Sequence, residues 1–172
     1  MISLEASLRA APVRPGSVGV AGDVFRETMS RVPGPVTIVT TTGPNGPHGT
    51  TVSAFCSLSA DPPLVLFALD RSSDLLGILP QSGRFAVNLL AGGQEWLGEA
   101  CARKGPEKLG LIPWYDENGL PRIDGAAAWL ACEVEELVPG GDHMIITGLV
   151  TACETSDSEA LIYHRRQFLS LA

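Results

Sequence analysis

The sequence is poor in charged residues and has no excess of positive ones. Only 18% of the 172 residues are Asp, Glu, Lys or Arg, and 12 Lys and Arg against 19 Asp and Glu give a formal charge of −7. A surface of this sign repels nucleic acids and anionic membranes, so we expect neither as a partner. The hydrophobic share of 45% is enough to build one core in a chain of this length.

The spacings of common metal and disulfide sites are also missing. The histidines form no HExxH or HxH pattern, and the four cysteines are too far apart for a CxxC pair. We expect no metal site, and a reduced chain in which the thiols are buried. These thiols belong to Cys56, Cys101, Cys132 and Cys153.

Membrane segments and several catalytic signatures are absent as well. No hydrophobic run approaches the roughly 20 residues that a membrane helix needs, and the N-terminus does not resemble a signal peptide, so we expect a cytoplasmic protein. The sequence has no GxSxG, no GxxxxGK(S/T), and no GxGxxG between a strand and a helix. Hydrolases, nucleotidases and Rossmann-type enzymes therefore lose their main support.

The pattern of breakers and β-branched residues predicts one domain, residues 22–172, behind a flexible arm, residues 1–21. A helix begins at Asp23, and two β-branched runs, 36–41 and 49–55, flank a Gly/Pro cluster that is typical of a hairpin. The continuous apolar run 64–69 predicts a central strand that is covered on both faces.

Further elements follow the same rules. We expect helices from Ser73 and over 94–103, a strand over 85–90, a hairpin over 128–135 and 144–150, and a last strand over 160–163. About seven strands joined by hairpins or short helices predict a mainly β fold, an antiparallel barrel or sandwich with peripheral helices. A doubly wound sheet is disfavoured.

Two polar segments are candidates for ligand binding. Hydroxyl and small residues concentrate over 50–59, where they could hold a phosphate together with backbone N–H groups. The alternative, a solvent-facing strand surface, is the more common explanation. The segment 70–74 precedes a helix whose N-terminus would attract an anion, although capping by Ser72 or Ser73 explains it equally.

Three further segments are ambiguous. His143 directly follows a Gly-Gly-Asp turn, at a rim where it could touch a ligand. The aromatic and basic segment 163–168 also fits a solvated turn, and 104–108 is either a flap or a surface loop.

In their order along the chain, these segments resemble the short-chain flavin reductases, the reductase partners of two-component flavin-dependent monooxygenases. The resemblance runs from Asp23 to Phe168. It departs from the usual pattern at Thr50, where a larger apolar residue is common, and at Ser53, where Asn is common. It rests on residues 35–40, 49–59, 61–64, 70–73, 84–90, 104–108 with Trp114, 141–143 and 163–168.

The resemblance implies an FMN-binding split β-barrel that forms a homodimer, with the flavin near the subunit interface. It places the flavin ring and ribityl chain along Thr51, Val52, Ser53 and Ala54. It places the flavin phosphate at Ser57, Ser59, Ser72 and Ser73, adds Leu58 and Asp70 from the same segments, and sets Phe85 in the site wall. It brings the nicotinamide nucleotide to His143, with Tyr163, Arg166 and Phe168 nearby.

The activity implied is that of an NAD(P)H:flavin oxidoreductase, with NADH preferred, which reduces FAD or FMN by hydride transfer and supplies free reduced flavin to a separate monooxygenase. The two cofactors carry this chemistry, so no nucleophile, strong base or metal is needed. Two alternatives stay open. One is an enzyme of the same barrel that keeps its flavin, like pyridoxamine-phosphate oxidase, and the other is a flavin- or haem-binding module without activity.

Overall fold

The computed structural model describes residues 18–105 and 108–170, so most of the expected arm 1–21 lies outside the described residues. The helical elements are α2 (Gly22–Met29), α3 (Asp74–Ser82), α4 (Glu95–Ala102) and the 3-10 turn η1 (Lys108–Leu111). The strands are β1 (Gly34–Pro35), β2 (Thr37–Gly43), β3 (Gly46–Val52), β4 (Phe55–Ala60), β5 (Pro63–Asp70), β6 (Arg84–Leu89), β7 (Trp114–Glu117), β8 (Leu120–Ile123), β9 (Ala128–Gly140), β10 (His143–Thr155), β11 (Leu161–His164) and β12 (Gln167–Ser170).

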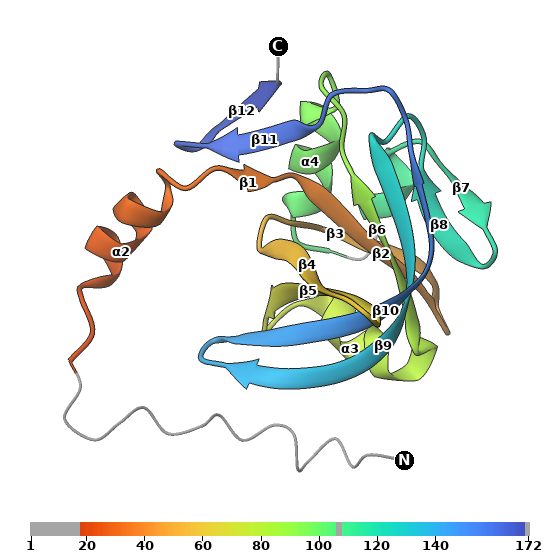
Figure 1. The fold of residues 1–172 in the computed structure, drawn as a ribbon, viewed down its shortest axis with the longest axis horizontal. Helices are drawn as coiled ribbons and strands as arrows, with labels where there is room; N and C mark the ends of the chain where they lie inside the picture. The colour runs from red at the N-terminus through yellow and green to blue at the C-terminus, as the bar shows by residue number, and fades with distance from the viewer. Residues whose placement is uncertain (1–17, 106–107, 171–172) are drawn as a thin grey trace.

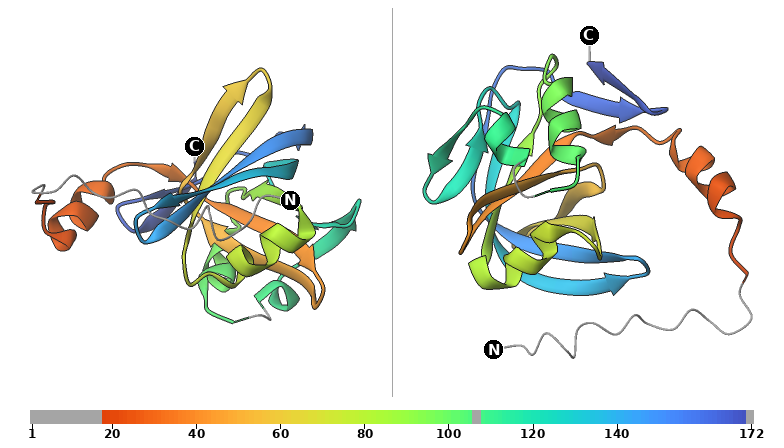
Figure 2. Two further views of the ribbon diagram at one scale, coloured as in Figure 1. Left: turned by 90° about the horizontal axis from the view of Figure 1, so that it is seen from below. Right: turned by 180° about the vertical axis from the view of Figure 1, so that it is seen from behind.

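A curled sheet of seven strands forms the body of the molecule (Figures 1 and 2). Its order is β3-β2-β6-β9-β10-β5-β4, and every neighbouring pair is antiparallel. Among the described residues no pairing joins the edge strands β3 and β4, so the barrel is split. The predicted mainly β, antiparallel fold class is confirmed.

Alternate residues of these strands point into one hydrophobic core. Phe67 of β5 and Phe85 of β6 meet there edge to face, with ring centroids 5.0 Å apart, and Met144 and Ile146 of β10 pack in the same cluster. Asn88 is one of the buried polar residues, and its side chain donates to the Ile38 carbonyl and accepts from the backbone of β8. A buried amide with its partners in place stabilises the junction it spans.

Two strand predictions need correction. The run 64–69 forms β5, but β5 lies next to the edge strand and is not central. Val65, Phe67 and Leu69 are buried, whereas Leu64 and Leu66 on the opposite face are only half-buried, because successive side chains of a strand point to opposite faces. The expected strand 49–55 breaks after residue 52, so β3 pairs with β2 and β4 pairs with β5.

Two features were not predicted. The hairpin β7–β8 turns at Asn118 and Gly119, whose φ angles of 54° and 84° fit the Asn-Gly turn of tight hairpins. Strand β12 follows β11 after a turn at Arg165 and Arg166, with φ angles of 49° and 62°, and completes a small sheet with β1.

Helix α2 stands apart from the body in both views (Figures 1 and 2). None of its residues is buried, and Phe25 and Met29 are 55% and 46% exposed.

The expectation of buried thiols holds for Cys101 and Cys132, whereas Cys56 and Cys153 are exposed. Burial raises the pKa of Cys101 to about 11 and that of Cys132 to about 12. No helix in residues 18–105 and 108–170 is long and apolar enough to cross a bilayer.

Candidate functional site

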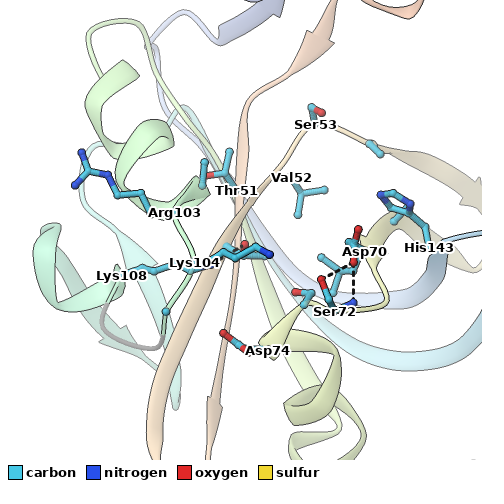
Figure 3. Close-up of a pocket in the computed structure, with 17 residues that line it drawn as sticks. Thr51, Val52, Ser53, Asp70, Ser72, Asp74, Arg103, Lys104, Lys108 and His143 are labelled. Carbon is cyan, nitrogen blue, oxygen red and sulfur yellow. Dashed lines mark hydrogen bonds between the residues drawn. The ribbon is translucent and has the colours of Figure 1, made fainter. Parts of the chain in front are cut away.

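The larger of two adjoining clefts has a volume of about 680 Å³ and forms where several elements end or begin. The chain crosses it from β3 to β4, α3 and β10 begin at its edge, and α4 ends there (Figure 3). Of the residues proposed from the sequence, it brings together Thr51, Val52, Ser53, Ala54, Asp70, Ser72, Ser73 and His143.

The turn before α3 forms one wall of the larger cleft. Asp70 accepts hydrogen bonds from both the backbone N–H and the hydroxyl of Ser72, each at 2.7 Å (Figure 3). These bonds lower the pKa of the Asp70 carboxyl, with the Ser72 hydroxyl contributing most. Ser73 precedes the helix, and its hydroxyl makes no capping bond there. A hydroxyl beside the N-H groups of a helix start suits an anionic group.

His143 is held at the same wall by the neighbouring turns. The Arg71 guanidinium donates to the Gly141 carbonyl at 2.9 Å, which ties the β9–β10 turn to the end of β5. His143 Nδ1 contacts the Asp142 carboxylate at 2.8 Å, and this hydrogen bond lowers the pKa of Asp142. Because Asp142 engages Nδ1, a ligand in the cleft would meet Nε2.

The opposite wall is cationic and carries Arg103, Lys104 and Lys108 (Figure 3). Lys108 is only 9% exposed, and its ammonium donates to the Thr50 hydroxyl at 3.3 Å. Among the described residues no carboxylate lies within ion-pair distance of Lys108. Burial lowers the pKa of this ammonium. A buried cation whose hydrogen-bond partner among the described residues is a hydroxyl favours an anionic ligand.

Sequence reasoning missed Lys108 as a site residue. It lies in the segment interpreted as a flap or a surface loop, of which residues 106 and 107 are outside the described part. A lysine in a loop rich in Gly and Pro gives no signal of burial. His48 is also buried, with 4% exposure. Burial lowers the pKa of its imidazole, and the positive charge of Lys108 lowers it further. No described residue hydrogen-bonds its Nε2.

The smaller cleft, of about 550 Å³, adjoins the larger one, because Thr51, Ser53 and Ala102 line both. The Thr51 hydroxyl donates to the Gly98 carbonyl at 2.6 Å and so fixes β3 against α4 between the two clefts. The smaller cleft contains the predicted residues Tyr163, Arg166 and Phe168, with the two rings 5.3 Å apart.

Four proposed site residues line neither cleft. Phe85 is fully buried, because its position on β6 points into the barrel, and we correct its assignment from site wall to core. Ser57, Leu58 and Ser59 lie on the edge strand β4, where a bulge interrupts the pairing with β5. His143 lies in the larger cleft and does not line the smaller cleft with Tyr163, Arg166 and Phe168.

The residues present fit a phosphate-bearing ligand with a flat ring. The larger cleft combines a buried ammonium, hydroxyls before a helix, and a backbone segment of small side chains from residue 51 to 54 that a ring can approach closely. Three Lys and Arg side chains against two Asp side chains line it, in a chain whose formal charge is −7. The described residues hold no cluster of metal-ligating side chains.

Known proteins are similar to this chain over most of its length. The family described as "Flavin reductase like domain" matches residues 29–172. The reductase component of 4-hydroxyphenylacetate 3-monooxygenase from Thermus thermophilus is 37% identical over 150 residues, which cover 87% of this chain and 96% of that protein. An NADH-dependent FMN reductase from Cronobacter sakazakii is 34% identical over 152 residues, which cover 86% and 92%. The chain spans 42% of the length of a flavin reductase relative from Rhizobium meliloti.

A solved structure extends the likeness to the fold. The NADH:FAD oxidoreductase of Streptomyces globisporus, in complex with NAD and FAD fragments, superposes with a TM-score of 0.84 at 31% identity and covers 91% of this chain and 96% of its own. The split sheet, the two adjoining clefts and the match over residues 29–172 lead to one assignment. The chain belongs to the family of flavin reductase-like domains.

Proposed function

We propose that the protein is an NADH-dependent flavin reductase that reduces FMN or FAD and releases the reduced flavin to a separate flavin-dependent monooxygenase. The observation that carries this proposal is the pair of clefts that share Thr51 and Ser53. Two nucleotides bound in adjoining clefts bring their reactive rings together over the shared wall, and alignment of this kind is what hydride transfer requires.

The chain's own residues bind and orient. In this proposal the backbone of residues 51–54 supports the flavin ring, and Ser72, Ser73 and Lys108 hold its phosphate. Tyr163, Phe168 and Arg166 receive the nicotinamide nucleotide, and His143 approaches it from the far side of the larger cleft. Bound flavin supplies the acceptor for a hydride, in the balanced reaction NADH + H⁺ + flavin giving NAD⁺ and dihydroflavin.

The named relatives support the partner and the nucleotides. The Thermus thermophilus relative is the reductase component of a monooxygenase, the Cronobacter sakazakii relative is an NADH-dependent FMN reductase, and the Streptomyces globisporus neighbour is an NADH:FAD oxidoreductase. NADH recurs among these names while the flavin varies. We therefore propose NADH as the donor and either flavin as the acceptor for this chain.

We also propose that the protein is a homodimer. The outer face of β5 carries half-buried Leu64 and Leu66, and Leu58 of the neighbouring edge strand β4 is 49% exposed. An apolar sheet face of this kind is typical of an interface. A second copy over it would cover the segment 57–59, whose side chains line no cleft of the single chain.

Dialysis of the purified protein tests whether the flavin is a substrate or a resident cofactor. Under the proposal the dialysed protein is colourless and binds added FMN reversibly, since the larger cleft is open to solvent. If about one flavin per chain stayed bound through dialysis, the result would instead support an enzyme that keeps its flavin.

Replacement of His143 tests the role given to the far wall of the larger cleft. We expect His143→Ala to lower kcat/KM for NADH by about 3- to 10-fold, the loss typical of one hydrogen bond to a ligand. His143→Gln, which keeps a donor, should recover part of the loss. Steady-state rates at varied NADH concentration and pH check this, and kinetics identical to those of the wild-type protein would remove His143 from the site.

A further inference from the structure

Arg166, on the rim of the smaller cleft, is already engaged by a carboxylate of the chain. Its Nη2 donates to Glu27 Oε2 at 3.3 Å, and the other carboxylate oxygen of Glu27 lies 3.6 Å from Arg31 Nη2. Glu27 therefore stands between two guanidinium groups. All three side chains are more than half exposed, so the cluster is accessible to a nucleotide.

The backbone holds Glu27 in this position. The turn between β11 and β12 puts both Arg165 and Arg166 in the left-handed region, and the Arg165 N–H donates to the Ser30 carbonyl at 2.7 Å. This bond fixes the end of α2 beside the rim of the cleft. The family match begins at residue 29, so Glu27 lies two residues before the matched segment, on the helix that leads into it.

The charges at this rim bear on which nicotinamide nucleotide can bind. NADPH differs from NADH by one phosphate on the adenosine ribose, and an arginine fork is the preferred partner of such a phosphate. Here Arg166 already donates one hydrogen bond to Glu27, and the carboxylate of Glu99 lines the cleft itself. A phosphate dianion would have to displace Glu27 and would be repelled by it.

We propose that Glu27 is a specificity-determining residue that disfavours NADPH by occupying Arg166. The inference rests on the proposed function, because it assumes that the smaller cleft receives the nicotinamide nucleotide. Loss of the Glu27 charge would free Arg166 and Arg31 together, with Arg165 adjacent in the turn. Three unpaired arginines would then favour the additional phosphate of NADPH.

The test compares Glu27→Gln with Asp23→Asn, which removes an equal charge from the same helix but has no ion pair with Arg166. At low ionic strength we expect Glu27→Gln to raise the NADPH:NADH ratio of kcat/KM about fivefold, within the range of an exposed ion pair, and Asp23→Asn to change it less than about 1.5-fold. Calorimetric titration should show the same relative gain for NADP⁺ over NAD⁺. In about 0.5 M salt the fold-increase in the NADPH:NADH ratio should fall toward one, because such charges are screened.

Several outcomes would overturn the proposal. An unchanged ratio in Glu27→Gln, or an equal rise in Asp23→Asn, would show that the Glu27–Arg166 pair does not select the nucleotide. Should Glu27→Gln fail to fold, Glu27→Lys gives the same comparison with a larger expected rise. Wild-type protein that oxidises neither nucleotide with any flavin would refute the proposed function itself, whereas full NADH activity with an unshifted ratio would refute only the role of Glu27.

Discussion

The Lys108→Met variant should bind FMN about 30- to 100-fold more weakly than the wild-type protein, while its affinity for riboflavin should change by less than about twofold. Met keeps the length of the side chain and removes the ammonium. Lys108 is 9% exposed and has the Thr50 hydroxyl as its hydrogen-bond partner, so a phosphate in the larger cleft would satisfy a charge that is otherwise costly to bury. Riboflavin lacks the phosphate and does not depend on that charge. Fluorescence titration of each flavin gives both constants.

Two controls separate the role of Lys108 from a general loss of positive charge. Lys104→Met removes a charge from the same wall, but Lys104 is exposed, and FMN affinity should fall by no more than about threefold. Lys108→Arg should restore part of the FMN affinity. A parallel loss of FMN and riboflavin binding in Lys108→Met would mean that the lysine supports the fold and not the phosphate.

The lowered pKa of Lys108 also gives the FMN affinity a pH dependence. The ammonium form binds the phosphate, so affinity is present below the pKa of Lys108 and is lost as the pH rises through it. Because burial lowers this pKa from its ordinary value, the loss should begin at a lower pH than an exposed lysine would give. The Lys108→Met variant should lack this part of the pH dependence.

The Phe85→Ala variant should lower the free energy of unfolding by about 3–4 kcal/mol, the loss typical of a fully buried phenyl ring. The ring is 0% exposed and packs against Phe67 at 5.0 Å between centroids. It also fills the space above Gly148, where an added Cβ would clash with its Cζ. Urea unfolding measures the change, and Phe25→Ala, on the exposed face of α2, is the control with an expected loss below about 0.5 kcal/mol.

Flavin binding in Phe85→Ala distinguishes a core role from the site role that the resemblance implied. Folded Phe85→Ala protein, studied at low temperature, should bind FMN with an affinity close to that of the wild-type protein. If the variant lost less than about 1 kcal/mol of unfolding free energy but much of its FMN affinity, Phe85 would line the flavin site and would not be a core residue.

Local patterns were sufficient for most elements of the fold. The Gly/Pro cluster 43–47 and the turn 139–142 each separate two β-branched or apolar runs, and both hairpins are confirmed. The Asn118-Gly119 turn carried an equally strong signal in the Pro- and Gly-rich passage 105–125, where no strand was predicted, and the hairpin β7–β8 was missed there. The apolar run of β5 indicated burial but not position in the sheet, because sheet order depends on pairings between residues far apart in sequence.

The site was less predictable, because it is assembled from four separate stretches of the chain, 50–54, 68–74, 102–105 with Lys108, and His143. Hydroxyls at 51–53 and the turn at 70–73 were found because they are locally unusual. The burial of Lys108 depends on the packing of η1 against β3, and no pattern within 104–108 reveals it. The orientation of Phe85 follows from the curl of the sheet around the core, which the resemblance alone did not specify. The Glu27–Arg166 pair joins residues 139 positions apart, beyond any spacing rule.

The most direct test of the account is the loss of nicotinamide absorbance when the dialysed protein meets NADH with FMN, with FAD, or with no added flavin. We expect rapid NADH oxidation that requires added flavin and saturates with it, and slower oxidation of NADPH under the same conditions. An absence of turnover with every combination of nucleotide and flavin would contradict the central claim that the two adjoining clefts align a nicotinamide with a dissociable flavin.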